Sequence, residues 1–150
     1  MRPLLRPALA AALAIAALAA CSGDAKPPAG RWQGVYEDAG LIVVARLEID
    51  PKGDIRVSAP NAIADLAAMS ENDRAGLRTR LLGELAQSWK KVGTLPLEFD
   101  GKNFHKPGGV APQLQWDARA GHMTMIYYSG NRASVRVPLD PVQQFDNADS

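Results

Sequence analysis

The chain has 150 residues, of which 47% belong to the hydrophobic set and 22% are charged, and its formal net charge is +1. This length accommodates one ordinary domain, with or without a targeting segment. A net charge so close to zero gives no support for nucleic-acid binding, which depends on a basic surface. The single cysteine, Cys21, excludes an internal disulfide framework and any cysteine-rich metal site.

The N-terminal segment begins like an export signal. Arg2 and Arg6 provide a basic start, and Ala8 to Ala20 is an unbroken run of 13 apolar residues. This run is too short for a transmembrane helix, which needs about 20 residues. It has the length of the apolar region of a signal peptide, so we expect residues 1–20 to direct export and then be removed.

The apolar run ends in the motif Leu18-Ala19-Ala20-Cys21, which resembles the lipobox of bacterial lipoproteins. The resemblance implies that the Cys21 thiol receives a diacylglyceryl group, that the peptide before it is cleaved, and that the new amino terminus is acylated. Each buried methylene contributes about 0.8 kcal/mol, so several acyl chains would anchor the protein stably to a membrane. Cleavage after Ala19 by an ordinary signal peptidase is the alternative.

Residues 21–30 are predicted to join the lipidated cysteine to the folded domain as a tether. The sequence after Cys21, SGDAKPPAG, contains two adjacent prolines and no apolar periodicity. Nine residues span at most about 30 Å, so the domain would lie close to the bilayer surface. Ser22, rather than aspartate, follows the cysteine. By the resemblance to lipoproteins, this implies the outer membrane, with the domain facing the periplasm.

The first part of the domain has the residue pattern of strands. Apolar and polar residues alternate at 32–36, at 41–50 and at 54–59. The sequence Pro51-Lys52-Gly53-Asp54 has its proline and glycine where a tight turn needs them. We therefore expect a first strand followed by a hairpin with one polar face.

The strongest element in the sequence is an amphipathic helix over about 71–91. Large apolar residues recur at i, i+4 spacing, at Leu77, Leu81, Leu85 and Trp89. Ser70 is the candidate N-cap, and Gly93 follows the end of the pattern. The preceding residues 60–69 also carry apolar side chains at helical spacing and are predicted to be helical.

Alternation with period two returns after the helix and predicts five further strands, at about 95–99, 103–105, 114–116, 123–128 and 133–139. Short connections indicate an antiparallel meander. The sequence therefore predicts, over 31–139, a mainly antiparallel β domain of about eight short strands, curled or barrel-like. One long helix is inserted between the third and fourth strands. A two-layer α+β arrangement is the alternative. Residues 140–150 are predicted to form a polar C-terminal tail.

The start of the first strand, Gly30-Arg31-Trp32, is similar to the Gly-x-Trp signature of the lipocalins. Lipocalins are β-barrels that carry small apolar ligands, so the resemblance implies an apolar pocket. The candidate lining residues are the aromatic side chains Trp32, Tyr36, Trp116 and Tyr127. The chain departs from the family because lipocalins place their main helix after the last strand. Under the alternative, Trp32 and Tyr36 are core aromatics of the first strand.

The sequence shows no catalytic motif, and no metal site or cofactor is predicted from it. His122, Met123 and Met125 are residue types that bind Cu(I). However, alternation places the imidazole on the opposite strand face from both thioethers. The two methionines are therefore predicted to be core residues.

These features favour a lipid-anchored periplasmic lipoprotein whose domain is a non-catalytic binding or interaction module, with an envelope protein as its partner. The alternatives are a lipocalin-like carrier of a small apolar ligand and an envelope hydrolase. A closed apolar cavity at the four aromatic residues would favour carriage, whereas a cleft in which His105 or His122 meets a carboxylate would favour a hydrolase. A filled barrel with an exposed apolar patch would favour contact with a protein.

Overall fold

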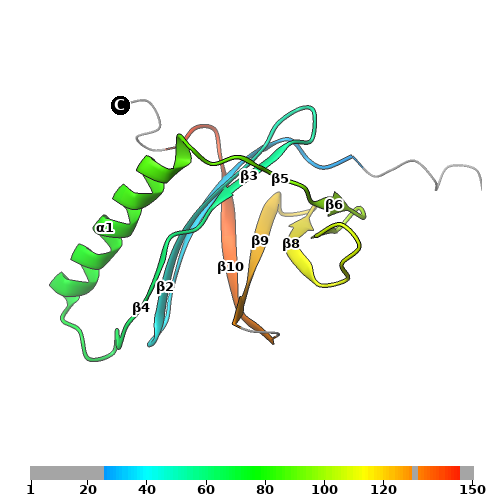
Figure 1. Ribbon diagram of the computed structural model, residues 1–150. Coiled ribbons are helices and arrows are strands. Elements are labelled where there is room, and N and C mark those ends of the chain that lie inside the picture. Colours follow the sequence, from blue (N-terminus) through cyan, green and yellow to red (C-terminus); the bar gives the residue numbers. More distant parts are fainter. Residues whose placement is uncertain (1–25, 130–131, 146–150) are drawn as a thin grey trace, which may run out of the picture.

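The computed structural model describes residues 26–129 and 132–145. Within these ranges the chain forms one helix and a 10-stranded sheet whose neighbouring strands are antiparallel (Figure 1). The elements are β1 (Gly30–Glu37), β2 (Leu41–Ile49), β3 (Ile55–Ser58), β4 (Asn61–Ile63), α1 (Glu71–Trp89), β5 (Thr94–Leu95), β6 (Glu98–Phe99), β7 (Asn103–His105), β8 (Pro112–Asp117), β9 (His122–Ser129) and β10 (Arg132–Val142). This architecture confirms the predicted mainly antiparallel, curled fold.

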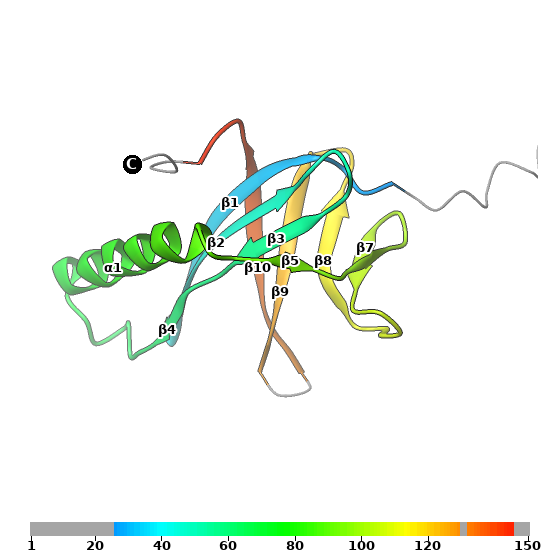
Figure 2. The same ribbon diagram turned by 45° about the horizontal axis from the view of Figure 1, so that its top comes forward.

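The sheet curls because the short segment 94–99 supplies the edge strand at both ends of the sheet. The strand order is β5-β3-β2-β1-β10-β9-β8-β7-β6, with β4 pairing separately with β2. The edge strands β5 and β6 are separated in sequence only by Pro96 and Leu97. The chain therefore passes directly from one edge of the sheet to the other, and the two halves of the sheet face each other (Figure 2). Such short, proline-interrupted edges offer little backbone for pairing with other chains.

The concave side of the curled sheet, called the inner face below, holds the main core. Because side chains alternate along a strand, every second residue of the long strands reaches it. Its buried members are Trp32, Val43, Ala45, Leu47, Ile49, Ile55, Phe104, Leu114, Met123, Met125, Val135, Val137 and Leu139. The predicted core role of the two methionines is thus confirmed.

The helix α1 packs on the opposite, convex side, called the outer face below, where it covers β2 and β3. Leu81 and Leu85 are buried there together with Ile42 and Val44 of β2 and with Leu66. Even-numbered residues of β2 thus meet the helix, and odd-numbered residues fill the inner core.

Both ends of α1 are fixed by side chains. The Ser70 hydroxyl oxygen accepts a hydrogen bond from the backbone N–H of Asp73 at 3.2 Å, which confirms Ser70 as the N-cap. At the other end, the Arg56 guanidinium donates to the carbonyl oxygens of Trp89 (2.7 Å) and Val92 (3.3 Å). It also lies 4.6 Å from the centre of the Trp89 ring. These bonds give side-chain partners to carbonyl groups at the end of the helix and just beyond it.

The prediction that residues 60–69 are helical is wrong, because this segment forms a short strand followed by turns, and α1 begins only at Glu71. Residues Asn61–Ile63 form β4, which pairs with the first three residues of β2. The Pro60 carbonyl also accepts a hydrogen bond from the Val44 N–H at 3.0 Å. The long strand β2 offers backbone partners along its whole length, and this outweighs the helical spacing of apolar side chains. As a result, α1 follows the fourth strand rather than the third.

The strand predicted to end at Leu139 continues to Val142, because Arg31 of β1 pairs with Val142. After it the chain turns over the outer face and buries Phe145, whose ring packs edge-on against Trp89 with a centroid distance of 4.9 Å. Residues 140–145 of the predicted polar tail are therefore part of the packed domain.

The predicted signal peptide, Cys21 and residues 22–25 of the tether lie outside the described residues, as do residues 146–150 of the tail. In the part of the chain that the structure does describe, no helix is both long and apolar enough to cross a membrane.

Candidate binding cleft

The four aromatic residues predicted to line a pocket all belong to the inner core or pack against it. Trp32 is buried, its indole N–H donates to the Gly121 carbonyl oxygen at 3.0 Å, and its ring meets Trp116 edge-on at 5.8 Å. Tyr36 and Tyr127 are partly buried on the same inner face. None of the four lines the large cavity that the described residues form beside α1.

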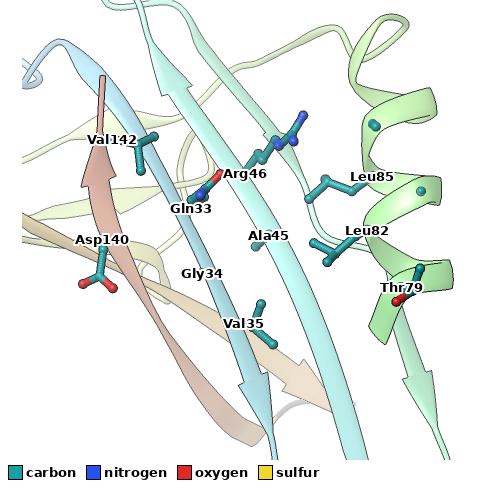
Figure 3. A pocket seen from close by; sticks show the side chains of 12 residues that line it. Gln33, Gly34, Val35, Ala45, Arg46, Thr79, Leu82, Leu85, Asp140 and Val142 are labelled. Carbon is teal, nitrogen blue, oxygen red and sulfur yellow. The ribbon is translucent and has the colours of Figure 1, made fainter. Parts of the chain in front are cut away.

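That cavity is a cleft on the outer face, between α1 and the strands β1, β2 and β10, with a volume of about 800 Å³ (Figure 3). We call it the outer cleft. It is lined by Gln33, Gly34, Val35, Ala45, Arg46, Thr79, Leu82, Gly83, Leu85, Ala86, Asp140 and Val142. Its volume lies within the range of about 300–1,000 Å³ that is typical of ligand sites.

The outer cleft exists because one helix is too narrow to cover the outer face of four strands. Strands lie about 4.8 Å apart, so β3, β2, β1 and β10 span roughly 15 Å, whereas a helix with its side chains is about 10–12 Å wide. The helix lies over β2 and β3 and leaves β1 and β10 uncovered beside it.

Two large apolar side chains remain exposed in the cleft. Val35 of β1 is 44% exposed, and Leu82 of α1, which reaches toward β2 in Figure 3, is 42% exposed. Apart from Leu82 and the buried Leu85, the helix contributes only small residues to the cleft, namely Thr79, Gly83 and Ala86. The apolar surface is therefore concave and open to the solvent.

A buried arginine stands at one end of the cleft, the end nearest the start of β1. Arg46 is only 4% exposed, and its guanidinium lies 5.0 Å from the centre of the Phe145 ring. Arginine stays protonated in proteins, so the cleft carries a fixed positive charge at this end. Gln33 pairs with Arg46 across the strands, and Asp140 pairs with Gln33 on the other side.

His105 meets a carboxylate, but far from the cleft, in the turn between β6 and β7. Its Nε2 atom lies 3.0 Å from Oδ2 of Asp100, whose Oδ1 also accepts the backbone N–H groups of Asn103 and Lys102. The bond from Asn103, followed by those from His105 and Lys102, holds the pKa of Asp100 well below its usual range. Nδ1 of His105 is buried without a hydrogen-bond partner in the described chain.

His122 meets a carboxylate at the rim of the cleft, since its Nδ1 atom lies 3.6 Å from Oδ1 of Asp140. This separation is longer than a hydrogen bond. The His122 side chain is 49% exposed and the Asp140 side chain is 73% exposed. Among the residues that the structure describes, no three histidine, cysteine, aspartate or glutamate side chains gather closely enough to hold a metal ion.

Comparison with known proteins adds no relative to this description. No protein-family model, no curated protein and no solved structure matches the chain.

Proposed function

We propose that this chain is a lipoprotein of the bacterial envelope, anchored through Cys21 to the outer membrane, and that its β-rich domain is a non-catalytic binding module facing the periplasm. The anchor is supported by the motif at 18–21 and the apolar run before it. The binding role is supported by the outer cleft, where Val35 and Leu82 stay exposed in a concave surface. Exposed apolar surface of this shape is typical of a binding site.

The anchor is tested by the variant Cys21→Ser, expressed with its signal peptide and compared with the native chain after membrane fractionation. The native mature protein should remain with the outer membrane, and its N-terminal peptide should carry the mass of the lipid. The variant should stay as an uncleaved precursor or be released. A mature native protein with an unmodified Cys21 thiol contradicts the anchor.

The binding role is tested by thiol labelling, which is possible because lipidation removes the only native thiol. Leu82→Cys places a thiol in the cleft, and Leu95→Cys places one outside it on a residue of matched exposure, 43% against 42%. In isolated envelope membranes, a maleimide should label Leu82→Cys several-fold more slowly than Leu95→Cys. Equal rates would mean that the cleft is empty and would contradict the binding role.

A hydrolase acting on envelope material is a second candidate, and the position of His122 beside Asp140 at the cleft rim favours it. The pair is exposed, and such pairs contribute little stability, so a role in chemistry would explain its position. Purified protein can be incubated with peptidoglycan and with p-nitrophenyl acetate. Hydrolysis that His122→Gln abolishes would support this candidate, and the absence of turnover by the native protein would contradict it.

A further inference from the structure

The end of the domain from which the tether leaves is formed by the start of β1 and three turns. We call it the proximal end, and its turns are at residues 50–54, 100–102 and 117–121. The first turn follows β2, whose last residue, Ile49, pairs with Gly30 at the start of β1. The third turn accepts the indole N–H of Trp32 through the Gly121 carbonyl oxygen. The second lies beside the third, because the Lys102 carbonyl oxygen accepts the backbone N–H of Trp116 at 2.7 Å.

The three proximal turns are built alike. Each begins with an aspartate whose Oδ1 atom accepts the backbone N–H of the residue two positions later, at 2.8, 2.9 and 2.9 Å. The aspartates are Asp50, Asp100 and Asp117. The donating residues are Lys52, Lys102 and Arg119, and all three are exposed. The proximal end therefore carries one basic side chain on each of its turns.

The turn itself does not require a basic residue. At the opposite end of the sheet, in the connection between β1 and β2, Oδ1 of Asp38 accepts the backbone N–H of Gly40 at 2.8 Å. Gly40 thus occupies the place that a lysine or an arginine has in the proximal turns. The three cations are explained by what this end of the domain faces rather than by the turn geometry.

The three proximal turns are not positively charged as a whole, because each basic residue follows a carboxylate. The two kinds of side chain differ in reach. The aspartates are short and are bound to the backbone of their own turns, whereas lysine and arginine have long, flexible stems that carry the charge away from the backbone. A surface that approaches this end meets ammonium and guanidinium groups first, and both groups bind phosphate.

The tether holds this same end close to its anchor. The described chain begins at Lys26, beside the turn between β2 and β3 (Figure 2), and a Cβ atom on Gly53 of that turn would lie 3.5 Å from Cγ of Pro27. Lys26 follows Cys21 by five residues, which span at most about 18 Å. The turn of Asp38 lies at the far end of β2, whose nine residues extend about 30 Å. The short tether therefore favours orientations in which the proximal end is nearer to the membrane.

We infer that the proximal end rests on the membrane surface, with Lys52, Lys102 and Arg119 among the phosphate groups of the lipid heads. This inference rests on the proposed function, because the anchor at Cys21 brings the domain to the membrane. It adds an orientation to that function, in which the turn of Asp38 points away from the bilayer.

The test measures how close each end of the lipidated full chain lies to the head groups of a vesicle. Lipidation removes the native thiol, so Ala118→Cys and Ala39→Cys each provide one thiol for a nitrobenzoxadiazole label. Both alanines are exposed and directly follow the aspartate of their turn, one at the proximal end and one at the opposite end. The vesicles contain phosphatidylcholine and a phospholipid with a nitroxide on its head group. The nitroxide should quench the label at position 118 at least threefold more than the label at position 39. Equal quenching at both positions overturns the inference.

A matched pair of variants tests the three cations. Replacing all three by glutamine in the Ala118→Cys chain should reduce the quenching at least twofold, because the proximal end then loses its contacts with phosphate. The control replaces three other basic residues by glutamine and should leave the quenching unchanged; these residues are Arg74, Arg80 and Lys106. Both variants lose three positive charges, so a general effect of net charge would change both equally. Quenching that the proximal replacements leave unchanged overturns the inference.

The outcomes separate this inference from the proposed function. A lipidated, vesicle-bound chain whose two labels are quenched equally contradicts the orientation and leaves the anchor and the binding role standing. A mature chain whose Cys21 thiol is unmodified contradicts the proposed function itself.

Discussion

At Gly34, the inner face of β1 has no room for a side chain. A Cβ atom at this position would lie 2.1 Å from the carbonyl oxygen of Pro138 in β10, which is backbone and cannot rotate away. We expect Gly34→Ala to lower the free energy of unfolding by about 1–3 kcal/mol, measured by urea denaturation. Gly76→Ala, in an open helical position, should instead stabilise by up to about 1 kcal/mol. A Gly34→Ala midpoint equal to that of the native chain would contradict the close approach of these strands.

The carboxyl group of Asp100 should make stability depend on pH in the acid range. Its pKa is lowered by hydrogen bonds from the backbone of Asn103, from His105 and from the backbone of Lys102, so the folded state favours the charged form. The stabilisation is complete above the unfolded pKa of about 3.9 and decreases as the pH falls below it. Asp100→Asn should therefore be less stable than the native chain at pH 7, with a difference that shrinks below about pH 4. Thermal melts across this range measure it, and a constant difference would contradict this assignment.

The sequence predicts which way most strand side chains point but not what covers them. Alternation correctly separates His122 from Met123 and Met125, because the two sides of a strand are fixed by backbone geometry alone. The same alternation places Arg46 on a polar face, yet this residue is buried. Its cover includes Phe145, which comes from the other end of the chain, and no local pattern encodes that contact.

At the level of elements, only one face of α1 packs against the sheet. Substitutions of two adjacent leucines, one on that face and one beside it, can test this arrangement. Leu81 is buried against Ile42 and Val44, whereas Leu82 is 42% exposed in the cleft. Leu81→Ala should cost about 2–5 kcal/mol of stability, as truncations of buried leucines do. Leu82→Ala should cost much less, since it removes little buried surface. Chemical denaturation measures both, and equal costs would mean that the helix is not docked as described.

The elements that the sequence failed to predict are those defined by pairing with distant strands. β4 has only three residues, and its apolar side chains suit a helix equally well, so nothing local distinguishes it. The last residues of β10 are strand because β1 pairs with them. In contrast, α1 could be predicted because a long run of i, i+4 apolar residues with an N-cap is a purely local signal.

At the scale of the whole molecule, the outer cleft depends on which strands the helix leaves uncovered. The sequence marks Leu82 as an extra apolar residue beside the buried helix stripe, and Val35 as an apolar residue on the polar side of β1. These were the available signals for the cleft. Neither indicates a site until the register of β1, β2 and β10 brings both residues to one side of α1. The aromatic residues that attract attention in the sequence instead pack against the inner core.

The C-terminal segment connects α1 to the sheet through the ring of Phe145. Removing this ring should loosen the C-terminal end of α1. Phe145 packs edge-on against Trp89 of α1 and lies beneath Arg46 of β2, so it joins three distant parts of the chain. We expect Phe145→Ala to destabilise the fold by about 3–5 kcal/mol.

Hydrogen exchange locates the effect of this variant. The backbone amides of the last turn of α1 should exchange faster in Phe145→Ala, while those of β8 and β9, on the far side of the sheet, should change only as much as global stability requires. Gln144→Ala, at an exposed neighbouring position, is the matched control and should leave both regions unchanged. If the end of α1 kept its native protection in Phe145→Ala, the C-terminal segment would not be the element that holds the helix at the Arg46 end of the cleft.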